Sequence, residues 1–112
     1  MSPITTHILD TSKGAPAEGV NVVLYQQKNN NWEEIGKGIT NKDGRISDLL
    51  RAETQLAFGA YKLKFDTKSY FDEVSVQTFY PFVEIVFEIN TNAHYHVPLL
   101  LNPFGYSTYR GS

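Results

Sequence analysis

Short apolar runs separated by turn-forming residues dominate the chain, and no long stretch keeps a helical period. The clearest alternation covers residues 61–65, where aromatic and leucine side chains alternate with two lysines. A second alternation covers residues 83–89, with Glu84 and Glu88 opposite the apolar side chains. Period-two patterns of this kind predict strands that place one face in a core.

The same reasoning predicts the rest of an all-β fold. Further strands are expected at residues 5–10, 20–26, 32–40, 45–50, 94–101 and 106–110. One short helix is expected over residues 67–73, with the side chain of Asp66 or Thr67 capping the free N–H groups at its N-terminus. Gly44 is expected to take a positive φ in a tight hairpin connection at 41–44. About seven or eight strands with frequent turns predict a sandwich of two antiparallel sheets, forming one domain over residues 1–112.

Composition excludes several classes of protein. Hydrophobic residues make up 41% of the 112 residues and charged residues 20%, which are globular values. A net charge of -2 without a basic cluster argues against a nucleic-acid partner. The absence of cysteine excludes disulfides and thiolate chemistry. No apolar run is long enough for a membrane span, and residues 1–4 do not resemble a signal peptide. We therefore expect a cytoplasmic protein, with export after signal removal as the alternative.

Two strands carry histidine on the face that should point away from the core. Tyr95, Val97 and the two leucines at 99 and 101 form a natural core face, which leaves both histidines of the strand on the other face. In the first predicted strand, His7 likewise lies on the outer face, and its neighbour Ile8 points to the other face. Because two stacked sheets fill the space between them with side chains, any chemistry of His7 and His96 must occur on an outer face. A second copy of the chain would cover that face, so we predict an oligomer with its active site at a subunit contact.

Taken singly, each candidate has an ordinary structural explanation. A lone histidine on a strand is usually a hydrogen-bonded surface residue, and Arg45 after a turn is usually a solvated charge. His94 and His96 with His7 could bind zinc, but no cysteine or adjacent carboxylate supports that site, so we expect no metal. A serine nucleophile is not supported, since no Gly-x-Ser-x-Gly elbow is present.

Four segments together point to one family. They are Thr6-His7-Ile8-Leu9-Asp10, Asp43-Gly44-Arg45, His94-Tyr95-His96-Val97-Pro98 and Tyr109-Arg110-Gly111-Ser112. These segments resemble the 5-hydroxyisourate hydrolases of the transthyretin-like fold. The similarity also runs through 66–70 and 80–85, so it covers nearly the whole chain. One departure is Asn102, where the family pattern has serine.

The resemblance implies a transthyretin-like sandwich that assembles as a homotetramer, with active sites in a central channel between subunits. The implied reaction hydrolyses 5-hydroxyisourate to 2-oxo-4-hydroxy-4-carboxy-5-ureidoimidazoline in urate degradation, without a cofactor. The implied catalytic residues are His7, Arg45, His96 and Ser112, and the implied substrate contacts are His7, Arg45 and Tyr109. Either His7 or His96 would activate water, and Arg45 would stabilise the oxyanion. Tyr109 would stack on or hydrogen-bond to the heterocycle, and Ser112 would orient a histidine.

The main alternative is a transthyretin-type carrier of thyroid hormone or of another small aromatic ligand, which the chain resembles at 66–70 and 105–108. His7, His96 and the segment 110–112 favour the hydrolase, since a carrier has no need of these groups. A third alternative, a structural or adhesion module, predicts a monomer with solvated histidines.

Overall fold

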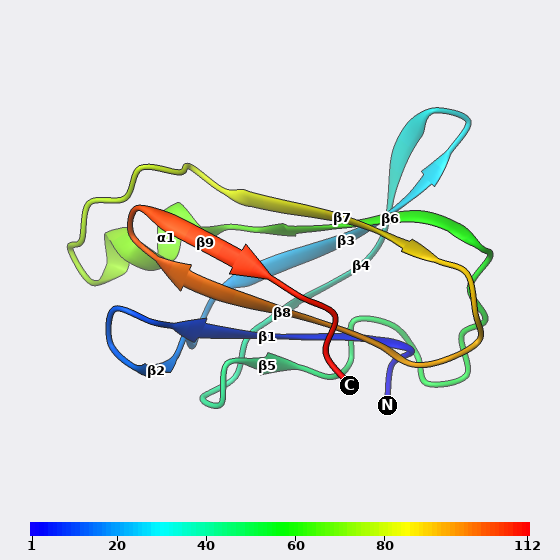
Figure 1. The fold of residues 1–112 in the computed structure, drawn as a ribbon, viewed down its shortest axis with the longest axis horizontal. Coiled ribbons are helices and arrows are strands. Elements are labelled where there is room, and N and C mark those ends of the chain that lie inside the picture. Colours follow the sequence, from blue (N-terminus) through cyan, green and yellow to red (C-terminus); the bar gives the residue numbers. More distant parts are fainter.

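Two β-sheets stacked face to face form the molecule in the computed structural model, which describes residues 1–112 (Figure 1). The first sheet has the order β2-β1-β8-β9, with β5 also paired to β1. Its strands are β1 (Ile4–Asp10), β2 (Ala15–Pro16), β5 (Arg45–Ile46), β8 (Tyr95–Asn102) and β9 (Gly105–Thr108). The second sheet has the order β4-β3-β6-β7. Its strands are β3 (Asn21–Lys28), β4 (Asn31–Ile39), β6 (Gly59–Phe65) and β7 (Val83–Ile89).

The core lies between the sheets and is built from the alternating side chains that the sequence indicates. The buried apolar residues include Tyr61, Leu63 and Phe65 of β6, Val83, Ile85 and Ile89 of β7, Ile4 and Ile8 of β1, and Tyr95, Val97, Leu99 and Leu101 of β8. These alternations therefore place one face of each strand in the core, as predicted. The outer faces of β1 and β8 carry the histidines.

The single helix, α1 (Thr67–Glu73), has the predicted bounds. Asp66 is its N-cap, and a carboxylate oxygen of Asp66 accepts a hydrogen bond from the Ser69 N–H. Tyr70 and Phe71 are buried against the core, and the Tyr70 hydroxyl donates to the Asp10 carboxylate at 2.7 Å. This bond fixes the end of β1 against the helix. With seven residues, α1 has neither the length nor the apolar character of a membrane-spanning helix, and the chain contains no other helix.

The all-β, transthyretin-like fold class is confirmed, with one difference in strand direction. Every strand pair is antiparallel except β1 and β8, which run parallel. The difference arises because β1 and β8 come from distant parts of the chain and are not joined by a hairpin, so nothing local imposes an antiparallel arrangement.

Several strands differ in detail from the prediction. β5 is only two residues long, because the polypeptide turns away from β1 after Ile46. Its backbone at Leu49 then lies against Gly36 of β4, and a Cβ added to Gly36 would be only 2.2 Å from the Leu49 carbonyl oxygen. β9 covers residues 105–108 instead of 106–110. β2 is not among the predicted strands, and it forms a two-residue pairing with the end of β1.

Gly44 takes the predicted positive φ of +72°, but the turn it belongs to is not a hairpin. It carries the chain from β4 in the second sheet to β5 in the first sheet, where β5 pairs with β1. The Gly44 carbonyl accepts the Ile8 N–H at 2.8 Å, and a Cβ on Gly44 would lie 2.5 Å from the Ile8 carbonyl oxygen. Gly44 is therefore required both by its backbone conformation and by close approach to β1.

The close approach at Gly44 predicts an unusually costly substitution. Gly44→Ala should lower the free energy of unfolding by about 2 kcal/mol or more, because it adds a backbone clash to left-handed strain. Gly14→Ala is the matched control, since Gly14 has a φ of +66° and a Cβ added there would meet no heavy atom within 4 Å. Urea denaturation should show the larger loss for Gly44→Ala, and equal losses would contradict the close approach.

Candidate active site

The parallel register of β1 and β8 brings two histidines together on the outer face of the first sheet. Thr5 lies opposite His96 and His7 lies opposite Pro98, so the outward side chains of the two strands interleave. The Nδ1 atom of His7 and the Nε2 atom of His96 are 2.7 Å apart, a hydrogen-bond distance. Their rings stack with centroids 4.9 Å apart and an interplanar angle of 25°. Two residues separated by 89 positions in sequence therefore form one unit.

Both ring nitrogens of His96 have partners. Its Nδ1 atom lies 2.7 Å from the Thr5 hydroxyl, which in turn lies 3.0 Å from Nε2 of His94. His96 is 9% exposed and Thr5 is buried, whereas His94 is exposed and His7 is half-buried. Hydrogen bonds thus fix the His96 ring, while Nε2 of His7 has no hydrogen-bond partner within the chain. The alternation of the strand puts Thr5 on the same face as His7, but nothing in the sequence identifies Thr5 as a link between histidines.

Arg45 reaches the same site from a third segment. It lies directly opposite His7 in the antiparallel pairing of β5 with β1, so both side chains project from the same face. Burial lowers the pKa of His7 below its ordinary value of 6.5, and the Arg45 cation lowers it further. Burial is also the main cause of the lowered pKa of His96, followed by the charges of His7, Arg45 and His94. Both imidazoles are consequently held neutral near pH 7.

The C-terminal segment crosses the site at His96. The Gly111 N–H donates to the His96 carbonyl at 2.8 Å, and a Cβ on Gly111 would be 2.6 Å from Cδ2 of the His96 ring. Glycine is needed here because the backbone lies directly on the imidazole. Ser112 follows this contact immediately and is exposed. Arg110 stacks on Tyr95, with its guanidinium carbon 4.4 Å from the ring centroid.

The structure does not bring Tyr109 to the histidines. Tyr109 is 55% exposed and lines a cleft between β7 and β9 together with Phe87, Glu88 and Thr108. A contact between Tyr109 and the substrate therefore stays a prediction.

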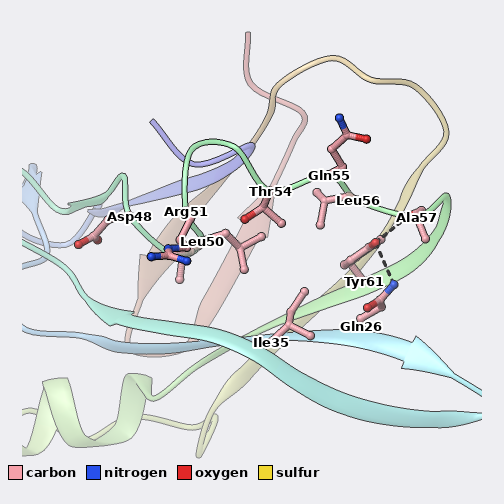
Figure 2. A pocket seen from close by; sticks show the side chains of 11 residues that line it. Gln26, Ile35, Asp48, Leu50, Arg51, Thr54, Gln55, Leu56, Ala57 and Tyr61 are labelled. Atoms are coloured by element: carbon pink, nitrogen blue, oxygen red, sulfur yellow. Dashed lines mark hydrogen bonds between the residues drawn. The ribbon is translucent and has the colours of Figure 1, made fainter.

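On the histidine face, His7 is half-buried and Arg45 is exposed in the single chain. Four clefts of about 330 to 580 Å³ lie elsewhere on the surface, and none of them is lined by His7, Arg45, His94 or His96. The one with the largest volume of these four lies beneath the segment from Asp48 to Ala57, where the Tyr61 hydroxyl donates to the Ala57 carbonyl and accepts from the Gln26 amide (Figure 2). No group of three or more histidine, cysteine, aspartate and glutamate side chains is arranged to hold a metal ion.

A basic, partly desolvated site of this kind can deprotonate water and stabilise negative charge on a neighbouring oxygen. Comparison with known proteins identifies its relatives. The model of the HIUase/transthyretin family matches residues 4–111. The chain belongs to this family.

Individual family members are similar over nearly the whole chain. A 5-hydroxyisourate hydrolase of Salmonella dublin is 49% identical over 110 residues, which cover 97% of this chain and 80% of that protein. The structure of 5-hydroxyisourate hydrolase from Klebsiella pneumoniae has a TM-score of 0.85 and 38% identity, covering 100% of this chain and 94% of that one. Sea bream transthyretin in complex with thyroxine has a TM-score of 0.91 and 35% identity, covering 97% and 94%. Similarity of backbone alone thus does not separate the two branches of the family.

The charge of Arg45 predicts a measurable effect on the histidines. Arg45→Gln should raise the pKa of both His7 and His96, because it removes a cation that disfavours their protonated forms. Arg45→Lys is the matched control, since it keeps the charge. Side-chain NMR titration would measure both values, and coinciding titration curves for the wild type and Arg45→Gln would contradict the electrostatic coupling.

Proposed function

We propose that this protein hydrolyses 5-hydroxyisourate to 2-oxo-4-hydroxy-4-carboxy-5-ureidoimidazoline, a step of urate degradation. The observation that carries the proposal is the hydrogen-bonded His7–His96 pair beside Arg45. Relatives with the name 5-hydroxyisourate hydrolase support it at up to 49% identity. Cleavage of a cyclic amide needs a base for water and a cation for the developing oxyanion, and this pair with Arg45 offers both.

His7 is the better candidate for the general base. Both nitrogens of His96 are occupied, one by His7 and the other by Thr5, so His96 has no free lone pair for water. His7 uses only Nδ1 within the chain, which leaves Nε2 available. Because its pKa is lowered, His7 is neutral at pH 7 and can accept a proton. His96 then orients His7 and supports the charge that forms on it.

Arg45 is proposed to bind the carbonyl oxygen that water attacks. Its guanidinium is permanently charged, and two of its N–H groups can donate to one planar polar edge of the heterocycle. Negative charge grows on that oxygen as the tetrahedral intermediate forms, so the interaction strengthens toward the transition state. The Ser112 hydroxyl, one residue beyond the Gly111 contact with His96, is proposed to help orient the histidines.

We also propose that the active unit is a homotetramer with its sites between subunits. β7 and β9 each form one edge of their sheet, and one cleft is lined by residues of both strands, so these two edges lie on the same side of the molecule. Exposed apolar side chains lie on or near these edges, namely Val86, Phe104 and Tyr106. The face that carries His7, His96 and Arg45 is a second, separate surface. Pairing of each of these two surfaces with the same surface of another copy would close an assembly of four.

The hydrolase proposal predicts faster loss of the ultraviolet absorbance of 5-hydroxyisourate prepared freshly from urate. His7→Ala should lower kcat by about 10²- to 10⁴-fold through loss of the base, and His96→Ala should also abolish most of the activity. Lys42→Ala is a control that removes an exposed cation from the turn before Arg45. Equal decay with and without the wild-type protein would end the proposal, and binding of thyroxine without turnover would favour a carrier.

The assembly proposal predicts a particle of four times the 12.7 kDa chain in native mass spectrometry. Specific activity should fall when dilution separates the subunits, because each site is completed by a neighbour. A monomer with undiminished specific activity at every concentration would contradict this arrangement.

A further inference from the structure

The hydrogen bonds of the site extend beyond the pair of histidines and reach the solvent. From His7 they pass to His96 at 2.7 Å, then to the Thr5 hydroxyl at 2.7 Å and finally to Nε2 of His94 at 3.0 Å. The two middle members, His96 and Thr5, are buried, with exposed fractions of 9% and 5%. His94 is exposed to water. This series of hydrogen bonds therefore joins the proposed base, His7, to bulk solvent through side chains that can each accept and release a proton.

We propose that Thr5 and His94 complete a proton relay, which carries the positive charge formed at His7 to the water-exposed ring of His94 and returns the proton when the substrate ring opens. This inference rests on the proposed hydrolysis, with His7 as the base. Thr5 and His94 would not touch the substrate, so they are positioning residues that act through His96.

The direction of the hydrogen bonds follows from the role of His7. A neutral imidazole has one donor and one acceptor nitrogen, and a hydroxyl donates one proton while accepting another. If Nε2 of His7 is to accept a proton from water, its Nδ1–H must donate to His96. His96 then donates through Nδ1–H to Thr5, whose O–H donates to Nε2 of His94. Each of these four side chains donates one hydrogen bond and accepts one, so all the hydrogen bonds of the series point in the same direction, from His7 to His94.

The relay can be written with each proton placed. Water bonds through its oxygen to the carbonyl carbon and gives one proton to Nε2 of His7. The Nδ1 proton of His7 moves to His96, the Nδ1 proton of His96 moves to Thr5, and the hydroxyl proton of Thr5 moves to His94, which becomes the cation. When the C–N bond breaks, the same steps run backward and Nε2–H of His7 protonates the departing nitrogen. The second proton of water stays on the new carboxylic acid and is lost to solvent.

Electrostatics favours moving the charge away from His7. A cation there would be partly desolvated and would lie beside Arg45, whose charge already lowers the pKa of both His7 and His96. His94 lies at the exposed end of the chain of hydrogen bonds, where water can solvate a positive charge. A charge placed on His94 therefore avoids both penalties while the oxyanion remains beside Arg45.

Two substitutions separate proton transfer from simple positioning. In His94→Gln, the amide oxygen can still accept the Thr5 hydrogen bond but cannot take a proton. We expect kcat to fall at least about tenfold with KM unchanged, which is less than the loss of the base itself because His7 remains. Thr5→Val removes the hydroxyl at nearly constant shape and should lower kcat similarly. Thr5→Ser keeps the hydroxyl and should retain most of the wild-type kcat.

His94→Ala provides a rescue test, because added imidazole can occupy the space left by the ring and accept the Thr5 proton. Imidazole should restore kcat in His94→Ala and should not restore it in Thr5→Val, whose defect is buried. Wild-type kcat in His94→Gln, or in Thr5→Val, would overturn the relay. Circular dichroism and native mass would be measured for each variant so that a folding defect is recognised.

A measurement without substrate keeps the relay testable if the protein does not act on 5-hydroxyisourate. Nitrogen chemical shifts should show His7 and His94 protonated at Nδ1 in the wild type, and Thr5→Val should release His94 from that tautomer. Protonation of His94 at Nε2 in the wild type would overturn the proposed polarity. An inactive wild type with the expected shifts would instead overturn the hydrolase proposal.

Discussion

The parallel pairing of β1 with β8 is the constraint on which the site depends. Its register sets Thr5 opposite His96, and a slip by one residue would turn every side chain of β1 to the other face. His7 would then enter the core and Ile8 would face water. The register is held by burial of Ile4 and Ile8 against the β8 core face, each such side chain stabilising the fold by roughly 1.5–3 kcal/mol. Core packing thus determines the geometry of groups on the opposite face.

Two glycines bring other segments onto this strand pair. Gly44 permits the chain to approach the Ile8 carbonyl, and the residue after it is Arg45, which pairs with His7. Gly111 permits the C-terminal segment to lie on the His96 ring. In both places the absence of a side chain allows backbone contact, and the next residue carries the polar group of interest. The site is therefore built from strand register and two points of close approach.

The sequence predicts the parts of this arrangement that depend on local pattern. Alternation locates β6 and β7, and Asp66 marks the start of α1, because burial and capping act within a few residues. Alternation also places His7 and His96 on outer faces, yet it cannot say that β1 and β8 are neighbours, since pairing between distant strands leaves no local signal. The Thr5 link and the Gly111 contact depend on that pairing, so they emerge only in three dimensions. The expected proximity of Tyr109 is not seen in the single chain for a related reason, because the path of a terminal segment depends on what it packs against.

The fold occurs both in a 5-hydroxyisourate hydrolase and in a transthyretin that binds thyroxine, so the side chains on the shared backbone must decide the chemistry. An apolar aromatic ligand placed over His7, His96 and Arg45 would remove water from a cation and from an imidazole nitrogen without replacing their hydrogen bonds, which costs about 1–3 kcal/mol for each such group. A heterocycle rich in carbonyl and N–H groups supplies those partners. The same charge that disfavours protonated histidine would also attract an oxyanion, so in the proposed mechanism Arg45 would keep the base neutral before the attack and stabilise the oxyanion that the attack forms. One cation next to a chain of imidazoles therefore favours hydrolysis over storage of an aromatic ligand.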